Sequence, residues 1–307
     1  MERKLAIDRD WPVYNENLVV RNEFYLDVDW IRKTWKIELD IMNEGKVGHP
    51  YEFPESLIRL QAAWYQLVTY RGVEGITRKL SKTGLIPDYN DFSAIQRRVI
   101  KIKIEFGSVD RKKSIKASCD GTGMRFTNGG VHREQTYGRN RKRCIKVTIV
   151  SNVETKELLE CDVSIEGNGL TEADVAHAIM MRFIREGRKI EKFWGDGSFH
   201  TKELFRFLEE NGIESAVKLR ENDVDSGKNT LRDREIQNLK KLGYKKWVKE
   251  KEYGLRWNAT EGIFSSVKRQ FGENVRSTKP QNAMKEVEMR FWLYDRMKKY
   301  AKERLHA

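Results

Sequence analysis

The chain has 307 residues, of which 39% are hydrophobic, and a formal net charge of +13. This length and hydrophobic content suit one large folded domain or two ordinary ones and exclude a disordered chain, while the positive excess favours a polyanionic partner such as nucleic acid. No uncharged apolar run approaches the roughly 18 residues of a membrane span and the N-terminus is charged throughout, so we expect a soluble, cytoplasmic protein with no membrane partner.

The N-terminal residues 1–56 hold more acidic than basic side chains, with 12 Asp and Glu against 8 Lys and Arg. An acidic segment is poorly suited to face the phosphate backbone of a nucleic acid. We therefore interpret residues 1–56 as a helical segment for packing or oligomerisation.

Residues 57–107 form a second segment, in which residues 57–104 carry 9 Lys and Arg against 3 Asp and Glu. The periodicity predicts three short helices, in ESLIRLQAAWYQLVTY, GVEGITRKLSKTG and PDYNDFSAIQRRVIKIKI, with a tight turn before the basic third one. This order favours a helix-turn-helix-like DNA-binding region, and a plain helical bundle with a solvated basic face is the alternative. The candidate DNA contacts are Arg97, Arg98, Lys101 and Lys103.

Strand signals begin at about residue 108. Three alternating segments, IKASCDGTGMRF, CIKVTIVSNV and ELLECDVSIE, precede an order of helix, strand, helix and strand. Leading strands of this kind form an antiparallel meander, and strands that alternate with helices add to the same sheet in parallel. Residues 108–307 are therefore expected to form an α/β core, a five-stranded mixed sheet flanked by helices, with the first and fourth strands as neighbours. Residues at about 222–250 are dense in charge and are interpreted as a partly helical insertion.

Two aspartates lie at the predicted ends of these neighbouring strands. Asp120 falls near the end of the first strand, where CDGTG lets the backbone turn, and Asp196 ends the fourth strand between two glycines. Glycine allows the close approach of a ligand or of another backbone, although Asp beside Gly is also the usual composition of a simple turn. Because the two strands are neighbours, we expect the two carboxylates to meet at one edge of the sheet.

Glu261 is the third acidic candidate, in the segment RWNATEGIFSSVKRQFG. On a helical wheel Glu261 and Lys268 share one edge of the apolar stripe, where the helix would meet the sheet. Asn258 lies three residues before Glu261, so the segment equally fits a capping box in which the glutamate only closes the helix N-terminus. Both interpretations stay open at this point.

Three carboxylates that converge on a basic surface repel one another and are stabilised by divalent cations. Two Mg²⁺ ions roughly 3.5–4 Å apart clamp the attacking and leaving oxygens of a phosphoryl transfer. Lys268 and its neighbour Arg269 would then hold the nucleic-acid backbone beside the metals.

The three acids lie in the motifs SCDGTGM, FWGDGSFHTKELFRFLEENGI and RWNATEGIFSSVKRQFGENV. With these motifs the chain resembles the DDE transposases of bacterial and archaeal insertion sequences, in the insertion-sequence-five-like group, whose catalytic core is RNase H-like. The signature of that family near the last acid is Tyr, two residues, Arg, three residues, Glu, six residues, Lys. Tyr253, Arg256, Glu261 and Lys268 match it, except that four residues separate the arginine from the glutamate. This departure concerns the grip of Tyr253 and Arg256 on the transposon end and leaves the acidic triad in place.

The resemblance implies a DNA transposase in which Asp120, Asp196 and Glu261 bind two Mg²⁺ ions, with Mn²⁺ as a substitute. Such an enzyme hydrolyses the phosphodiester at the end of its element, and the released 3′-OH attacks target DNA. The resemblance further implies recognition of the terminal inverted repeats by residues 57–107, a homodimer on double-stranded DNA ends, and a place at the prokaryotic nucleoid. The alternatives are an RNase H-like nuclease or resolvase without transposition, and an inactive DNA-binding derivative of a transposase.

Overall fold

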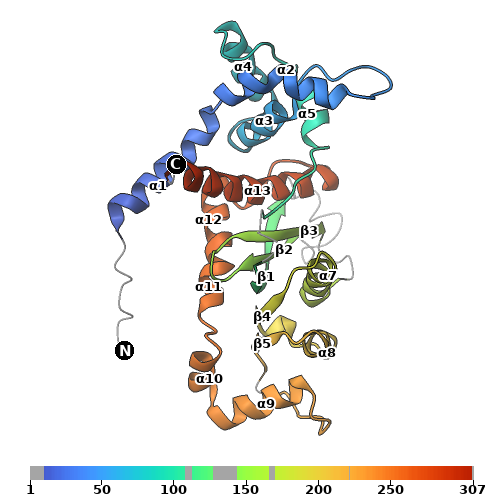
Figure 1. Ribbon diagram of the computed structural model, residues 1–307, viewed down its shortest axis with the longest axis vertical. Helices are drawn as coiled ribbons and strands as arrows, with labels where there is room; N and C mark the ends of the chain where they lie inside the picture. The colour runs from blue at the N-terminus through green and yellow to red at the C-terminus, as the bar shows by residue number, and fades with distance from the viewer. Residues whose placement is uncertain (1–9, 108–112, 127–143, 166–169, 221, 306–307) are drawn as a thin grey trace, which may run out of the picture. The chain divides into compact units, whose positions relative to one another are not determined.

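The computed structural model describes residues 10–107, 113–126, 144–165, 170–220 and 222–305 (Figure 1). Contacts within the chain divide it into two compact units, residues 1–104 with 289–307 and residues 105–288. The second unit ends at residue 288, whereas the segment expected from the sequence extended to residue 307. The last helix, α13 (Pro280–Leu305), contributes residues to both units.

The first unit is built from helices in its described residues. Their bounds are α1 Trp11–Glu23, the 3₁₀ helix η1 Phe24–Leu26, α2 Asp29–Asn43, α3 Glu55–Leu67, α4 Tyr70–Lys82 and α5 Phe92–Val99. Helix α3 supplies much of the core, because Leu57, Ile58 and Trp64 are buried in one cluster with Ile31 of α2 and Val99 of α5. Burying one face in this way is the main source of stability for such short helices. None of the described helices combines the length and apolar character required to cross a membrane.

The three helices predicted in residues 57–107 are α3, α4 and α5, but the tight turn lies elsewhere. Two residues separate α3 from α4, whereas residues 83–91 connect α4 to α5. That connection is longer than the turn of roughly 3–4 residues in a helix-turn-helix, so the prediction of a tight turn before the basic helix was wrong. The Asp91 side chain caps α5, which ends at Val99.

The second unit is built on a mixed sheet with the strand order β3-β2-β1-β4-β5. The strands are β1 Ile115–Phe126, β2 Ile145–Asn152, β3 Leu158–Ile165, β4 Ile190–Gly195 and β5 Glu214–Val217. Strands β1, β2 and β3 pair antiparallel, β4 is parallel to β1, and β5 is parallel to β4. The predicted meander, the neighbouring first and fourth strands and the mixed sheet flanked by helices are confirmed.

The sheet departs from the prediction in two details at the end of β1. A sixth strand, β6 (Asn274–Val275), pairs in parallel with Arg125 and Phe126, so the sheet has six strands among the described residues and not five. Two residues are too few to show the alternation by which a strand is predicted. Strand β1 is also longer than expected, because Gly121 and Gly123 pair with β2 and do not turn the chain.

Helices cover both faces of the sheet. They are α7 Glu172–Arg185, α8 Lys202–Glu210, α9 Leu231–Leu242, α10 Tyr244–Glu250, α11 Leu255–Ala259 and α12 Glu261–Phe271. Successive residues of a strand point to opposite faces. In β4, Phe193 accordingly packs in the cluster of α7 and α8, while Trp194 packs with Trp247 of α10 and Ala259 of α11.

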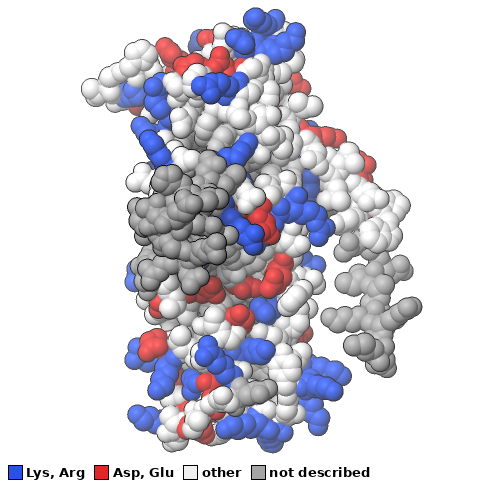
Figure 2. Space-filling view, turned by 180° about the vertical axis from the view of Figure 1, so that it is seen from behind, with Lys and Arg blue, Asp and Glu red and all other residues white. Residues whose placement is uncertain are grey.

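The charged insertion at about residues 222–250 is largely helical and is anchored in the core. Ile236 of α9 joins the cluster of Phe193, and Trp247 of α10 is only 1% exposed. Its outward side chains include the exposed lysines Lys240, Lys241, Lys245, Lys246 and Lys249. Figure 2 shows Lys and Arg gathered at the lower end of the molecule, where α9 and α10 lie in Figure 1.

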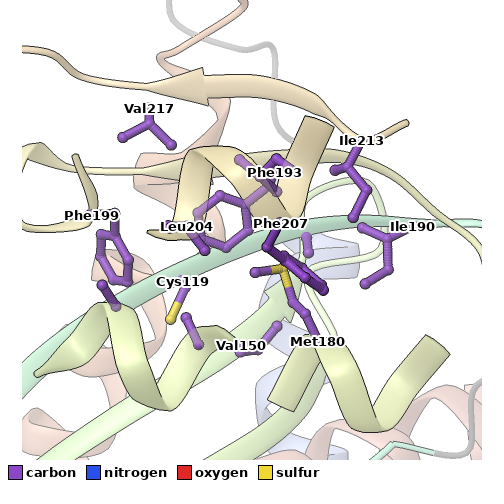
Figure 3. Packing of buried hydrophobic residues seen from close by; sticks show 14 of the residues in the cluster. Cys119, Val150, Met180, Ile190, Phe193, Phe199, Leu204, Phe207, Ile213 and Val217 are labelled. Atoms are coloured by element: carbon purple, nitrogen blue, oxygen red, sulfur yellow. The ribbon is translucent and has the colours of Figure 1, made fainter. Parts of the chain in front are cut away.

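The main core of the second unit lies between the sheet and the helices α7 and α8. Figure 3 shows Phe193 of β4 together with Cys119 of β1, Met180 of α7 and Phe207 of α8, all of which are buried. The side chain of Phe199, which follows β4, belongs to the same cluster and is fully buried. This core fixes the positions of β1 and β4 at the edge where both aspartates lie.

Candidate active site

Asp120 lies within β1 and is only 6% exposed. The strand continues through it to Phe126, so the predicted turn directly after Asp120 was wrong. The pairing of β1 with β4, however, ends at Ser118 and Trp194. Asp120 therefore lies just beyond the last paired residues of the two neighbouring strands.

Asp196 follows the last residue of β4 and precedes the 3₁₀ helix η2 (Gly197–Phe199). Its Oδ1 accepts hydrogen bonds from the backbone N–H of Ser198 at 2.7 Å and from the hydroxyl of the same residue at 2.6 Å. Because Ser118 pairs with Trp194 and the two strands are parallel, Asp120 and Asp196 each lie two residues beyond this pair. The register thus brings the two aspartates to the same edge of the sheet.

Glu261 is the first residue of α12, and Thr260 separates α12 from α11. Asn258 lies inside α11, and Thr260 at the N-cap position makes no side-chain capping bond. The capping box between Asn258 and Glu261 is therefore not formed, and that alternative was wrong. The Thr260 hydroxyl instead lies 3.3 Å from Asp120 Oδ2, within hydrogen-bond distance, which ties the start of α12 to β1.

Electrostatic effects on Asp120 connect the three acids. Burial raises the pKa of Asp120 to about 6. The hydrogen bond from the Gly121 backbone N–H and the charge of Arg256 lower this pKa, while the negative charges of Glu261 and Asp196 raise it further. Glu261 and Asp196 therefore both lie within electrostatic range of Asp120, and a cation relieves repulsion of this kind.

The donor atoms of this site are carboxylate oxygens, the ligands that Mg²⁺ and Mn²⁺ prefer. In the part of the chain that the structure describes, no group of three or more His, Cys, Asp and Glu side chains is arranged to hold a metal ion as it stands. Two contacts already use the oxygens of the aspartates: Arg256 Nη1 lies 3.5 Å from Asp120 Oδ2, and Ser198 donates to Asp196 Oδ1. The chemistry of these carboxylate donors fits a divalent cation.

A family model described as Transposase DDE domain matches residues 113–295. The chain belongs to the DDE transposases. A second family model with the same description matches residues 20–129. Enzymes of this family generally use divalent metal ions, in agreement with the oxygen donors of the site.

Two solved structures are similar to this transposase at low sequence identity. One is a piggyBac transposase synaptic complex with hairpin DNA, which is 10% identical with a TM-score of 0.34; the match covers 94% of this chain and 78% of that chain. The other is an intasome of simian T-cell lymphotropic virus in complex with a PP2A regulatory subunit, which is 12% identical with a TM-score of 0.24; the match covers 64% of this chain and 67% of that chain.

Tyr253 and Arg256, which were predicted to contact DNA, lie inside the transposase. Tyr253 is 7% exposed, its hydroxyl donates to the carbonyl of Gly195 at 3.3 Å, and burial raises its pKa to about 12. Arg256 is 8% exposed and its guanidinium lies 5.0 Å from the centre of the Tyr253 ring. Arg256 is part of α11, and the interval from Arg256 to Glu261 includes the helix break at Thr260. Burial leaves little of either side chain at the surface.

Lys268 and Arg269 lie near the end of α12. Lys268 is partly buried, and its ammonium lies 3.9 Å from the carboxylate of Glu273. Arg269 is exposed, and its Nη2 donates to Ser265 Oγ at 3.3 Å. Of the two, Arg269 presents more of its charge to solvent.

The basic candidates of the first unit differ in exposure. The exposed ones are Arg97, Lys101 and Lys103. Arg98 is partly buried: its guanidinium donates to the carbonyl of Phe53 at 3.4 Å and lies 4.7 Å from the centre of the Tyr51 ring. Burial lowers the pKa of Arg98. Arg98 therefore stabilises its own unit, and its three neighbours present their charges to solvent.

Sequence reasoning missed Glu172, the first residue of α7. Burial raises the pKa of the Cys119 thiol well above its usual value, and the negative charges of Asp120, Glu172 and Asp196 add to this effect. Glu172 therefore shares the surroundings of the two aspartates. No local signal in TEADVAH marks it, because the fold alone brings the start of α7 close to β1.

Proposed function

We propose that this transposase binds double-stranded DNA at the terminal inverted repeats of its element, cleaves the DNA there, and joins the released 3′-OH to target DNA. In this proposal Asp120, Asp196 and Glu261 hold two Mg²⁺ ions, which Mn²⁺ can replace. The observation that carries the proposal is the register of β1 and β4, which aligns the two aspartates, together with the charge of Glu261 acting on Asp120.

When bound, the divalent ions would stabilise the attacking and leaving oxygens of an in-line phosphoryl transfer. The chain's own contribution is to hold three acids at one edge of a rigid sheet, which lowers the cost of assembling the site. Asp120 is held within β1 and contacts Thr260, and Asp196 is held by two hydrogen bonds from Ser198. Glu261 starts α12, whose apolar face is buried through Ile263 and other residues of the helix.

We assign DNA binding to two exposed basic surfaces, one in each unit. The surface at α5 consists of Arg97, Lys101 and Lys103 and is proposed to recognise the terminal repeats. The surface of the insertion consists of Lys240, Lys241, Lys245, Lys246 and Lys249 and is proposed to contact DNA without sequence preference. Lysine and arginine contacts to phosphates make such binding strongly dependent on salt.

We also propose a homodimer held by α1 and α2. Large apolar side chains on these helices are exposed, among them Trp11 at 59%, Ile37 at 61% and Ile41 at 68%. Ile37 and Ile41 lie four residues apart, on one face of α2, and exposed apolar groups on one surface are typical of interaction sites. Light scattering on the purified protein should give the mass of a dimer, and Ile37→Ser combined with Ile41→Ser should shift it towards the monomer.

A plasmid that carries both ends of the element tests the catalytic proposal. With Mg²⁺, the wild-type protein should cut at the ends and join them to a second plasmid. Asp120→Ala, Asp196→Ala and Glu261→Ala should each abolish cleavage while end binding in a gel-shift assay persists. Glu210→Ala, at an exposed carboxylate of α8, is the matched control and should cleave normally. Cleavage without joining would favour the nuclease, and an active Asp196→Ala variant would overturn the acidic triad.

A further inference from the structure

The carboxylate of Glu172 lies against the backbone of β1 at Gly121, the residue that follows Asp120. A Cβ atom added at Gly121 would lie 2.3 Å from Glu172 Oε1, which no real pair of atoms tolerates. Only glycine at position 121 therefore leaves the carboxylate in this place. The Glu172 side chain is 24% exposed, so it is neither in the core nor fully in water.

Ser198 connects Glu172 to Asp196. The Ser198 hydroxyl oxygen lies 2.6 Å from Asp196 Oδ1 and 3.0 Å from Glu172 Oε2. A serine hydroxyl has one proton and donates it to one acceptor at a time, whereas an ionised carboxylate only accepts. The two carboxylates therefore share the single proton of Ser198, whose oxygen lies within hydrogen-bond distance of both.

The helix N-terminus does not require Glu172 for its capping. The start of α7 is closed by a capping box in which the Thr171 hydroxyl accepts from the Asp174 N–H and the Asp174 carboxylate accepts from the Thr171 N–H. The carboxylate of Glu172 instead contacts Gly121 of β1 and the hydroxyl of Ser198. Lys146 of β2 is the cation beside it, with Nζ 3.7 Å from Glu172 Oε1, and is 24% exposed.

We infer that Glu172 is a fourth acidic residue of this active site, acting as a positioning residue for Asp196. By sharing the Ser198 proton, Glu172 acts on the hydrogen bond that orients the Asp196 carboxylate, and its own carboxylate packs against Gly121, the residue after Asp120. Binding of a divalent ion by the acidic triad then depends on Glu172 without requiring it as a ligand. This inference rests on the proposed function, since it concerns the same metal-binding acids.

Binding of Mn²⁺ to the purified full-length protein tests the inference independently of catalysis. The free Mn²⁺ signal in electron paramagnetic resonance gives the dissociation constant for the wild type and each variant. Glu172→Ala and Ser198→Ala should each weaken binding by about 10-fold, as loss of a residue that orients a ligand does. The double variant should be no weaker than either single one, because both remove the same link. Glu172→Gln should recover most of the affinity, since its amide still pairs with Ser198.

Gly121→Ala tests the position of the Glu172 carboxylate without altering its charge. The added methyl group forces the flexible carboxylate away, so the variant should bind Mn²⁺ as weakly as Glu172→Ala. Glu203→Ala is the matched control, an exposed glutamate in the first turn of the neighbouring helix α8, and should bind like the wild type.

The outcomes separate this inference from the proposed function. A wild-type protein that binds no Mn²⁺ overturns the proposed function and this inference with it. Normal Mn²⁺ binding by Glu172→Ala and Ser198→Ala overturns the positioning role alone. Equal losses of Mn²⁺ affinity in Glu172→Ala and Glu172→Gln, with normal affinity in Ser198→Ala, also overturn the positioning role. The charge of Glu172 alone would then account for the effect. If Glu172→Ala fails to fold, Ser198→Ala and Gly121→Ala decide between these outcomes.

Discussion

The guanidinium of Arg256 lies 3.5 Å from the carboxylate of Asp120, and the two side chains are only 10% and 9% exposed. The arginine thus places a positive charge beside an acid whose ionised form is disfavoured by burial. Removing one partner of a buried pair leaves an uncompensated charge, which costs more than the pair itself contributes.

Arg256→Ala should lower the free energy of unfolding by about 2 kcal/mol, because Asp120 then stays buried without its cation. Adding Asp120→Asn should recover at least half of this loss, since the amide carries no charge. Urea denaturation without divalent ions measures both effects. Arg206→Ala, at an exposed position of α8, is the control and should change little. A double variant no more stable than Arg256→Ala would contradict the pairing.

The two glycines that flank Asp196 should respond differently to alanine. A Cβ added at Gly195 would lie 2.8 Å from the ring of the buried Phe199, whereas a Cβ at Gly197 would meet only the Lys218 carbonyl oxygen at 3.8 Å. Gly195→Ala should therefore destabilise the protein by about 2 kcal/mol through overpacking, and Gly197→Ala by less than about 0.5 kcal/mol. Thermal unfolding of the two variants is the measurement. Equal losses would show that close packing is not the reason for the glycine at position 195.

Arg97 and Arg98 are adjacent in sequence but should have different roles, the first in DNA binding and the second in stability. Arg97→Ala should weaken DNA binding and reduce the slope of the logarithm of affinity against the logarithm of salt concentration by about 1, as expected for one lost phosphate contact. Arg98→Ala should instead lower stability, because its guanidinium packs on Tyr51 and bonds to the carbonyl of Phe53. Binding titrations at several salt concentrations, paired with denaturation curves, distinguish the two. A normal salt slope in Arg97→Ala would remove α5 from the DNA interface.

Asp233 should make the insertion sensitive to acid. Hydrogen bonds from Ser226 and Thr230 lower the pKa of this buried carboxyl well below its usual value, although burial opposes the effect. Because the folded pKa lies below that of the unfolded chain, the stabilisation is fully present above pH about 4 and is lost as the pH falls through the folded value. Asp233→Asn should thus be less stable than the wild type at pH 7, and the difference should shrink below pH about 4. Urea midpoints across this range measure it, and a difference that does not depend on pH would contradict the role of the charge.

The sequence predicted the order of strands because alternation is recognisable in β1 to β3 and the helices between β3, β4 and β5 are amphipathic. It predicted the adjacency of Asp120 and Asp196 for the same reason, since that adjacency follows from strand order and direction alone. It did not predict the length of β1, because the glycines at 121 and 123 indicate a turn locally while pairing with β2 keeps them extended. Long-range pairing overrode local preference there.

Other features had no local signal that could be interpreted correctly. The helix breaks at Thr260, so Asn258 lies inside α11 and not at the start of α12. Its spacing from Glu261 fits a capping box and therefore indicated the wrong helix start. Tyr253 and Arg256 are buried because of contacts with Gly195 and Asp120. The residue types alone do not indicate this burial. Glu172 entered the site through contacts with Gly121 and Ser198, which are distant from it in sequence.

Phe193 and Trp194 point to opposite faces of β4, and this has a consequence for how the protein folds. A shift of this strand by a single position would send each ring into the layer built for the other, and it would move Asp196 out of step with Asp120 at the same time. A chain that pairs this strand wrongly therefore loses its hydrophobic layers and the alignment of Asp196 with Asp120 together. Slippage at this strand should not leave a misfolded protein in which the two aspartates remain aligned.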